Sequence, residues 1–325
     1  MKSNFPIELR ENLKFPIDNF NLLLRDLGWE SSKWFHYWIK NSGESLASSS
    51  WAQGTKSDWI WGLGLPFLSD IKRFFDDNSH RPLFGISALP GCGKTSFGKW
   101  LEASANELNF SLKVLSIDDF YLPANEMEVA MSGNPWKVPR ALPGSHSMDL
   151  LEKTIDKWLE TGSLEAPQFD KSLRNGMGDR SGWIQTRPDV LVLEGWFLGC
   201  NPANFSLKKN HDNLTPPLRE DEKKYREKVQ KLLLNYLIIW DKLDRIWHIK
   251  ARDFDFTSQW KLEQEKKMLI AKGAALQGKG LLSFVRMIQS SIPQSSLMNL
   301  DCDVVIEINN HRDILDIYPK INRKR

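Results

Sequence analysis

Five short apolar segments recur along the chain after Pro82, and each is almost continuously hydrophobic rather than alternating. They are residues 83–87, 113–117, 190–193, 245–249 and 304–308. Unbroken apolar runs of this length are typical of strands that are buried on both faces of a parallel sheet. Helical patterns separate these runs. The order of elements therefore predicts right-handed βαβ crossovers and an α/β fold with an open, doubly wound parallel sheet.

The first part of the chain has a different pattern, in which aromatic residues recur at near-helical spacing. These residues are Trp29, Trp34, Phe35 and Trp38. A second helix is predicted over residues 65–75, whose apolar positions fall on one face. We therefore expect an N-terminal helical region over residues 1–80, in which the tryptophans are packing residues, and an α/β domain over residues 81–325.

Two long connections interrupt the α/β pattern, near residues 120–147 and 164–189. Neither shows a clear strand or helix periodicity. Structureless connections of this length inside a compact domain usually serve as lids or binding loops. We expect both to contribute to a substrate site.

The composition is that of an ordinary globular protein. Of the 325 residues, 41% are hydrophobic and 26% are charged, which excludes a wholly disordered chain or a collagen-like repeat. The 44 basic and 41 acidic residues leave a net charge of only +3. This small surplus gives no argument for a nucleic-acid or membrane partner.

The cysteines and the apolar runs indicate the cellular compartment of the protein. Cys92, Cys200 and Cys302 lie far apart, so the sequence suggests neither a disulfide framework nor a zinc site. Residues 1–14 have no continuous hydrophobic core and do not resemble a secretory signal. The longest apolar stretch, residues 232–240, is too short to span a bilayer. We therefore expect a cytoplasmic protein.

The strongest chemical signal comes directly after the first predicted strand and before a helical pattern. It consists of Ala88, Leu89, Pro90, Gly91, Cys92, Gly93, Lys94, Thr95 and Ser96. This is a P-loop with alanine in place of the first glycine. Its glycines let the backbone wrap a phosphate, and the N–H groups at the helix start point at the anion. Lys94 is predicted to reach the β- and γ-phosphates of ATP, and the Thr95 hydroxyl to be a ligand of Mg²⁺. The sheet is then that of the three-layer P-loop NTPase fold.

Acidic residues end two further predicted strands. Asp118 follows the second strand, where ligands bind in open α/β sheets, and is predicted to accept a proton from an attacking hydroxyl. The neighbouring Asp119 is better explained as a turn or N-cap residue. Glu194 ends an apolar strand in the manner of a Walker B acid and is predicted to hold Mg²⁺ through water. The alternative for Glu194 is a buried carboxylate paired with a lysine.

Residues 240–244 resemble the guanine-recognition sequence of G proteins. The first residue of that motif is here Asp241 rather than asparagine, and the run upstream has a helical rather than a strand pattern. The sequence therefore favours an ATP-dependent kinase over a GTP-dependent switch.

With these motifs in place, the chain resembles the D-glycerate 3-kinase family of plants and cyanobacteria. These are P-loop kinases related to uridine kinase, pantothenate kinase and phosphoribulokinase. The resemblance runs from about Ile60 onward, and its motifs occur in the family's order. They are residues 85–95, 116–121, 143–146, 169–172, 178–180, 194–196 and 259–262. Lys261 stands where the family usually has arginine, and the first 60 residues and residues 200–223 match poorly.

The resemblance implies transfer of the ATP γ-phosphate to D-glycerate, giving 3-phospho-D-glycerate, which closes the photorespiratory glycolate pathway. The cations of the two long connections independently suit a small anionic acceptor. The acceptor-site candidates are Asp118, Tyr121, Arg140, His146, Lys171 and Arg180. Arg174 is the weakest of these cations because it has no motif of its own. The expected protein is a monomer. The alternatives are another small-molecule kinase, such as a pantothenate or uridine kinase, and a nucleotide-binding or assembly protein with no acceptor.

Overall fold

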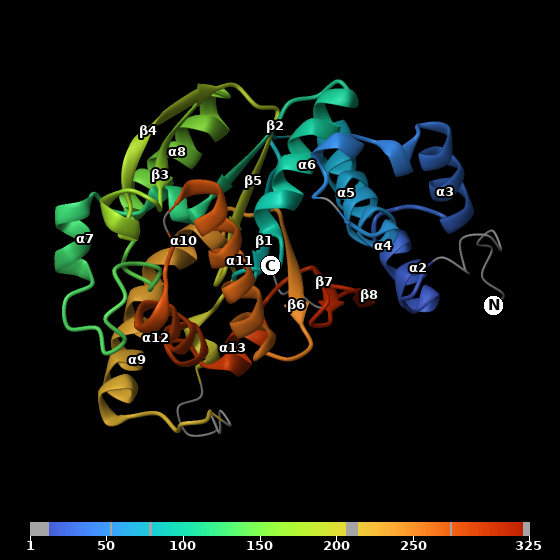
Figure 1. Ribbon diagram of the computed structural model, residues 1–325. Helices are drawn as coiled ribbons and strands as arrows, with labels where there is room; N and C mark the ends of the chain where they lie inside the picture. The colour runs from blue at the N-terminus through green and yellow to red at the C-terminus, as the bar shows by residue number, and fades with distance from the viewer. Residues whose placement is uncertain (1–12, 53, 78–79, 206–213, 274, 321–325) are drawn as a thin grey trace.

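The computed structural model describes residues 13–320, apart from residues 53, 78–79, 206–213 and 274 (Figure 1). The sequence of residues 1–14 does not resemble a secretory signal, and residues 1–12 of this segment lie outside the described residues. Among the helices that the structure describes, none combines the length and the apolar composition needed to cross a bilayer.

The core of the described chain is a six-stranded sheet with the order β2-β5-β1-β6-β7-β8. Its strands are β1 (Leu83–Ala88), β2 (Leu112–Ser116), β5 (Val190–Gly195), β6 (Arg245–Ala251), β7 (Val304–Ile308) and β8 (Ile314–Pro319). All neighbours pair in parallel except β8, which runs antiparallel to β7. The predicted parallel α/β sheet is confirmed, and the five predicted strands differ from the observed ones only at their ends.

β8 was not predicted. It is an edge strand that is buried only at Ile314 and Ile317, so its pattern lacks the continuous apolar run of the interior strands. By contrast, β1 and β5 are buried along their whole length. Gly85 of β1 makes this close packing possible, because a Cβ there would lie 2.8 Å from Leu198 and 3.0 Å from Leu243.

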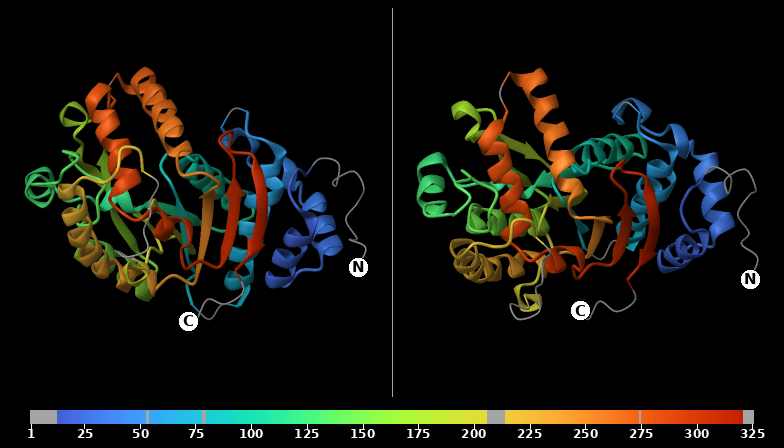
Figure 2. Two further views of the ribbon diagram at one scale, coloured as in Figure 1. Left: turned by 90° about the horizontal axis from the view of Figure 1, so that it is seen from below. Right: turned by 60° about the horizontal axis from the view of Figure 1, so that its bottom comes forward.

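Helices cover both faces of the sheet, which gives the three layers of a doubly wound fold (Figures 1 and 2). The helices of the described chain are α2 (Ile17–Asp26), α3 (Ser31–Lys40), α4 (Ser57–Trp59), α5 (Leu65–Asp77), α6 (Lys94–Glu107), α7 (Ala124–Ala130), α8 (Met148–Thr161), α9 (Glu220–Leu233), α10 (Leu237–Trp240), α11 (Phe256–Lys272), α12 (Gly278–Ser290) and α13 (Gln294–Met298). The residues that precede Asp241 are helical, as the sequence pattern predicted, rather than a strand of the kind that precedes the guanine-recognition motif.

The N-terminal helices pack directly on one face of the sheet. The ring of Phe67, on α5, lies 5.6 Å from that of Phe84 in β1 and 5.0 Å from that of Trp247 in β6. On the other side of α5, the indole N–H groups of Trp34 and Trp38 both donate to the Ser69 hydroxyl, at 2.8 and 3.0 Å. These aromatic residues are therefore packing residues.

A buried charge network joins α5 to the sheet. Asp70 is fully buried and accepts hydrogen bonds from Arg73 (2.8 Å), Arg245 (3.1 Å) and the Trp247 indole (2.9 Å). Arg245 also pairs with Asp26 of α2 at 2.6 Å. Burial raises the pKa of Asp70, although the two arginines oppose this shift. Asp70 thus balances the charge of the Arg245 guanidinium, which is buried against the face of the sheet.

Replacing Asp70 with alanine is expected to lower the free energy of unfolding by about 3–5 kcal/mol, because it leaves a buried arginine without its main partner. Urea denaturation followed by circular dichroism measures the change. Asp76 on the same helix is the matched control, since its pair with Lys72 is exposed. Asp76→Ala should cost no more than about 1 kcal/mol. Equal losses in the two variants would contradict the structural role of Asp70.

The structure corrects the expectation of two structureless connections. Residues 164–189 form a two-stranded antiparallel ribbon of β3 (Leu164–Asp170) and β4 (Asp179–Thr186). The sequence did not predict these strands, because one face of the ribbon is exposed and polar and because Pro167 interrupts the apolar pattern of β3. The connection over 120–147 begins with a 3₁₀ turn, Ile117–Phe120, and contains α7. Both segments therefore present side chains from ordered elements.

Candidate active site

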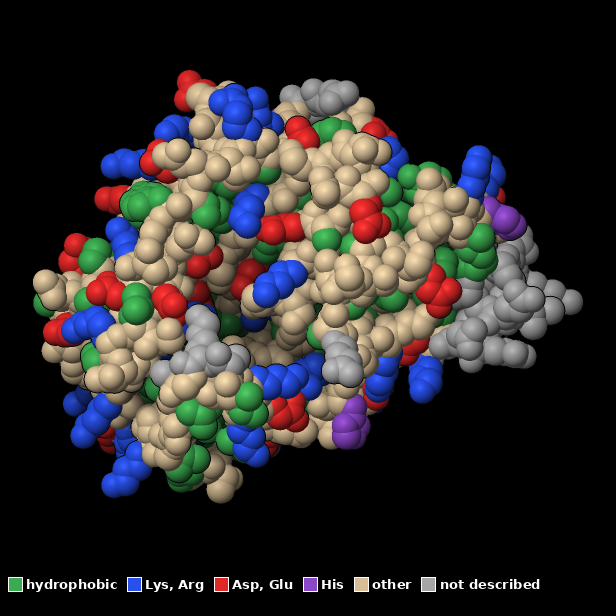
Figure 3. All heavy atoms as spheres, turned by 45° about the horizontal axis from the view of Figure 1, so that its top comes forward, with side chains coloured by type: hydrophobic (Ala, Val, Ile, Leu, Met, Phe, Trp, Pro, Cys, Tyr) green, Lys and Arg blue, Asp and Glu red, His purple; other side chains and the backbone are tan. Residues whose placement is uncertain are grey.

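A cavity of about 420 Å³ opens where β1, β2 and β5 reach their carboxyl ends. Figure 3 shows this hollow with basic and acidic side chains around its mouth. Ser116, Glu194 and residues 90–96 line it, together with residues from α11 and from the N-terminal region. This is the position at which open α/β sheets bind ligands.

The predicted P-loop joins β1 to α6 and wraps the floor of the cavity. Gly91 and Gly93 have φ angles of +83° and +114°, which favour glycine. A Cβ on Gly91 would lie 2.6 Å from the Trp260 Cβ, so the loop can follow this path only without a side chain. Residues 90–96 line the cavity, whereas Ala88 and Leu89 are buried behind it. The backbone cradle and the start of a 14-residue helix fit a bound phosphate chain.

Lys94 and Glu194 lie side by side in this cradle. The Lys94 ammonium donates to the carbonyls of Ala88 (2.7 Å) and Leu89 (3.3 Å) and lies 3.9 Å from the Glu194 carboxylate. Burial raises the pKa of Glu194, although Lys94 opposes this shift. Glu194 is thus near a lysine, as the alternative interpretation expected, and it also faces the cavity that Thr95 lines. A hydroxyl and a carboxylate suit Mg²⁺, which binds few protein oxygens and keeps several waters.

Glu194→Gln is expected to raise the Mg²⁺ concentration required for half-maximal rate by about tenfold, since it removes a carboxylate that would hold metal-bound water. A Mg²⁺ titration of the initial rate measures this. Glu102→Gln is the control, because Glu102 pairs with Lys113 at 2.9 Å and does not line the cavity. A titration that is unchanged in Glu194→Gln would remove this residue from the metal site.

Asp118 lies at the centre of a second cluster beside the P-loop. Lys171, which directly follows β3, donates to its Oδ2 at 2.5 Å, and His146 Nε2 lies 3.8 Å from its Oδ1. Burial alone would raise the pKa of Asp118, but Lys171 and His146 outweigh it and hold the pKa of that carboxyl well below its usual range. Asp118 is therefore ionised at neutral pH and able to accept a hydrogen bond from a hydroxyl.

The protonation of His146 follows from its neighbours. The Tyr236 hydroxyl accepts a hydrogen bond from the Gly144 N–H (2.9 Å) and lies 2.8 Å from His146 Nδ1. The hydroxyl can direct its own proton at Nδ1, in the tautomer that carries the ring proton on Nε2. Burial lowers the pKa of His146, which favours this neutral form. Nε2 is buried and makes no hydrogen bond to the described residues, and the Asp118 carboxylate, 3.8 Å away, is the acceptor that it faces.

Asp119 has a different environment from its neighbour. Its carboxylate accepts a hydrogen bond from the Ser116 N–H (3.2 Å) in a capping box, and a second one from the Phe169 N–H (3.4 Å). Burial raises the pKa of Asp119 to about 6. The residue holds the 3₁₀ turn after β2, in agreement with the turn or N-cap role expected for it.

Arg140 and Arg174, from the two long connections, lie in different environments. Arg140 is buried, and its Nη1 donates to the carbonyls of Gly176 (2.7 Å) and Met177 (2.6 Å). It pairs with no carboxylate in the part of the chain that the structure describes. Arg174, by contrast, is exposed, pairs with Glu128 at 2.7 Å and lines a separate hollow.

Tyr121 and Arg180 complete the wall around His146. The Tyr121 ring stacks on the imidazole with 4.6 Å between centroids, and burial raises the pKa of its phenol well above the usual range. Arg180 is half-buried, and its Nε donates to the Tyr121 carbonyl at 3.2 Å. Arg180 thus supports this wall through the backbone.

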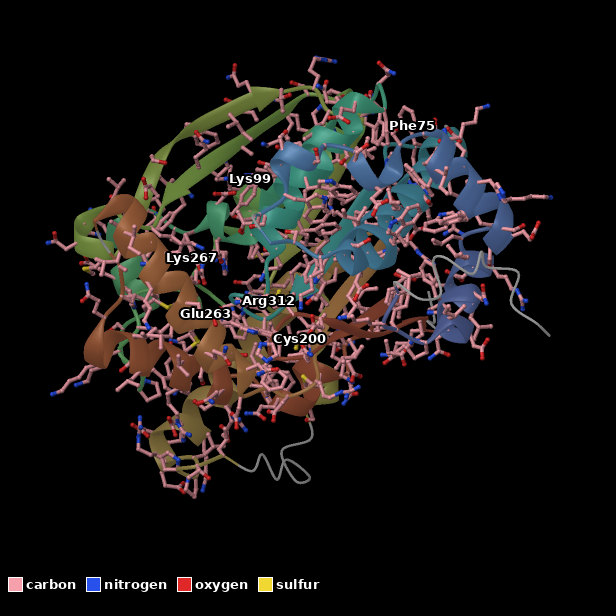
Figure 4. The ribbon with its side chains drawn as sticks, turned by 45° about the vertical axis from the view of Figure 1, so that its right-hand side comes forward. Phe75, Lys99, Cys200, Glu263, Lys267 and Arg312 are labelled. Carbon is pink, nitrogen blue, oxygen red and sulfur yellow. The ribbon has the colours of Figure 1, made fainter. Side chains whose placement is uncertain are left out.

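Two parts of the cavity wall were not predicted from the sequence. One is the turn after β7, where Arg312 donates to the Gly91 carbonyl (3.0 Å) and to Glu263 of α11 (2.9 Å); Figure 4 shows both side chains. Its position after a parallel strand was the available signal. The other is the segment 51–59 of the N-terminal region, for which no motif pointed to a ligand. Lys261, from the predicted motif 259–262, is buried and pairs with Glu265 at 2.5 Å.

Known proteins resemble this chain in sequence and in fold. Over 210 residues it is 32% identical to the chloroplastic D-glycerate 3-kinase of Arabidopsis thaliana, a match that covers 60% of this chain and 44% of that protein. It is 27% identical to the uncharacterized kinase mug58 of Schizosaccharomyces pombe, with 62% and 76% covered. The structure of D-glycerate 3-kinase from Cryptococcus neoformans matches with a TM-score of 0.65 at 22% identity, covering 78% of this chain and 96% of that one. No protein-family model matches.

The chain has the P-loop kinase fold. The Arabidopsis relative and the Cryptococcus structure confirm the resemblance to D-glycerate 3-kinases that the motifs indicated. In this fold, one cavity joins the P-loop cluster around Lys94 to the cluster around Asp118. Asp118 and Lys171 line this cavity together with the P-loop, whereas Tyr121, Arg140, His146 and Arg180 are not among its lining residues.

Proposed function

We propose that the protein transfers the γ-phosphate of ATP, with Mg²⁺, to the primary hydroxyl of D-glycerate and releases 3-phospho-D-glycerate and ADP. The protein is a phosphotransferase in this proposal. The identity of the acceptor is supported by the names of the Arabidopsis and Cryptococcus proteins that it resembles.

One observation carries the choice of a small carboxylic acid as acceptor. Arg140 is a buried guanidinium that bonds only carbonyl oxygens and has no carboxylate partner among the described residues. A buried unpaired charge is costly, so an anionic ligand would relieve that cost. Lys171 lies close enough to Arg140 for the two charges to repel. A glycerate carboxylate between these cations would place its hydroxyls toward Asp118 and His146.

The residues of the two clusters then have distinct roles. Asp118 accepts the proton of the attacking hydroxyl, and the Nε2–H of His146 donates to an acceptor oxygen. Lys94 and the P-loop N–H groups offset negative charge on the transferred phosphoryl group. Thr95 and Glu194 would hold Mg²⁺, which supplies further charge neutralisation when it is bound. Exclusion of water from the cavity when both substrates are bound would favour transfer over hydrolysis.

Arg140→Met is expected to raise the KM for D-glycerate about tenfold to hundredfold and to leave the KM for ATP nearly unchanged. The reason is that one charge-assisted hydrogen bond to a carboxylate is worth about 1.5–3 kcal/mol. Steady-state kinetics with each substrate varied in turn measures the two constants. Arg174→Ala is the matched control, because this arginine is exposed and already paired. Equal loss for both substrates would show that Arg140 only supports the fold.

The proposed function is tested by measuring ADP release with a panel of acceptors. The panel contains D-glycerate, L-glycerate, pantothenate, uridine and ribulose 5-phosphate. Stimulation by D-glycerate alone supports the proposal. Stimulation by pantothenate or uridine instead would identify another small-molecule kinase. ATP binding without stimulation by any of them would favour a nucleotide-binding or assembly protein, and so would overturn the proposal.

Three finer statements belong to this proposal. D-glycerate is the acceptor of the step that closes the photorespiratory glycolate pathway, so we propose this place for the enzyme. Buried, widely separated cysteines support a reducing compartment, here the cytoplasm. We propose a monomer, because both clusters of the site come from one chain. Light scattering of the purified protein tests this last point.

A further inference from the structure

The N-terminal region reaches the nucleotide cavity, although it lies outside the P-loop motif. Within the segment 51–59, the cavity is lined by Trp51, Ala52, Gly54, Thr55, Lys56 and Trp59. They face the side of the P-loop on which α6 begins. The role of these residues is not explained by phosphate binding or by the acceptor cluster.

Trp59 is joined to both other walls of this part of the cavity. Its indole N–H donates to the Arg312 carbonyl at 2.6 Å, and its ring lies 3.7 Å from the place where a Cβ on Gly93 would stand. Lys56 pairs with Asp313, the next residue along. The Arg312 guanidinium in turn bonds the Gly91 carbonyl. Lys56 and Trp59 are therefore held in a defined position against the P-loop.

Trp51 adds a second aromatic side chain to the same wall. Its ring stacks on Trp100 of α6, with centroids 4.6 Å apart and planes 22° apart. The Trp51 Nε1 is buried and has no hydrogen-bond partner in the described ranges. Trp51 therefore presents to the cavity an aromatic ring that is held by stacking rather than by a hydrogen bond.

The geometry of transfer decides which part of the nucleotide can lie here. The γ-phosphate must face the acceptor, so it lies toward Asp118 and Lys171. Attacking and leaving oxygens are roughly in line in phosphoryl transfer, so the rest of the nucleotide extends away from that cluster. The cavity continues past Thr95 and Ser96 to the segment 51–59 and Arg312. Aromatic rings and cations suit a purine ring and its ribose.

We infer that residues 51–52 and 54–59 form a wall of the nucleoside subsite, in which the indoles of Trp51 and Trp59 contact the base of a purine nucleotide. The inference rests on the proposed function, since it assigns the part of ATP beyond the phosphates. It gives the N-terminal helical region a direct part in nucleotide recognition. The turn that carries Arg312 adjoins this wall through its contact with Trp59 and lines the same cavity.

The test compares ADP with inorganic tripolyphosphate, which carries phosphates but no base. Isothermal titration calorimetry measures both affinities for the parent, Trp51→Ala and Trp59→Ala. We expect the Kd for ADP to rise about tenfold to hundredfold in both variants, as for loss of a base-stacking aromatic. The Kd for tripolyphosphate should change little. Trp59→Phe, which keeps an aromatic ring, should fall between the parent and Trp59→Ala.

Trp29→Ala is the matched control, because Trp29 lies in the same region and contacts Tyr37 rather than the cavity. Thermal melting of each variant shows that it is folded. Unchanged ADP affinity in both alanine variants would overturn the inference. So would equal weakening of ADP and tripolyphosphate, which would show that the tryptophans only support the P-loop. If the parent bound neither compound, the proposed function itself would fail, and this outcome is distinct from the other two.

Discussion

Replacing Asp118 with asparagine is expected to lower kcat by about 10²–10⁴-fold while the nucleotide still binds, as is typical for loss of a general base. Asparagine keeps the shape of the side chain but cannot take the proton of the acceptor hydroxyl. The substitution also leaves the Lys171 ammonium without the carboxylate that it contacts at 2.5 Å. Steady-state kinetics, with ADP binding measured separately by calorimetry, gives both quantities.

Asp119→Asn is the matched control for this prediction, since the two residues are adjacent and chemically identical. Asp119 accepts backbone hydrogen bonds from Ser116 and Phe169 and holds a turn. Its replacement should therefore reduce stability by about 1 kcal/mol, as the loss of a cap does, and have a much smaller effect on kcat. A large loss of turnover in Asp119→Asn, with a near-normal Asp118→Asn enzyme, would reverse the two roles.

The low pKa of Asp118 makes the mechanism more specific. A carboxylate that is held ionised by Lys171 is a weak base, and it is better suited to orienting a hydroxyl than to removing its proton early. Phosphoryl transfer has a loose transition state in which positioning and charge stabilisation dominate. The acceptor proton then moves late, when the attacking oxygen has already begun to bond phosphorus. The ion pair also places Lys171, the cation that would bind the acceptor carboxylate, directly beside the base Asp118.

The strands and the P-loop could be predicted because each depends on local sequence. Strands buried on both faces leave continuous apolar runs, and a phosphate cradle needs glycines beside a lysine. The ribbon of β3 and β4 could not be predicted in the same way. It is exposed on one face, so its pattern is diluted, and its stability depends on pairing with a partner strand and on contacts with α8 and with the turn after β2.

The residues of the candidate site also differ in whether local sequence or tertiary contact determines their positions. Lys94, Asp118 and Glu194 follow strands that the sequence reveals, so their positions at one edge of the sheet could be expected. Tyr236 could not, because its contact with His146 joins residues 90 positions apart in the chain. Tyr236 is fully buried, as a packing residue would be, yet its hydroxyl also contacts the His146 ring. Tertiary contacts of this kind leave no trace in periodicity or motif spacing.

Lys94→Ala is expected to lower kcat/KM by about 10³-fold or more, because a cation that stabilises transferring phosphate is worth several kcal/mol and each 1.36 kcal/mol is about tenfold. The fold should persist, since Lys94 bonds only two carbonyls of its own loop. Lys99→Ala is the matched control: this lysine is exposed on the same helix and does not line the cavity (Figure 4). The Lys94 variant also loses the ammonium 3.9 Å from Glu194 that lowers the pKa of that carboxyl, so the Mg²⁺ dependence of the rate should change as well. Initial rates, a thermal melt and a Mg²⁺ titration separate these effects. A Lys94→Ala enzyme within about tenfold of the parent would show that the P-loop of this chain does not act on the transferred phosphate.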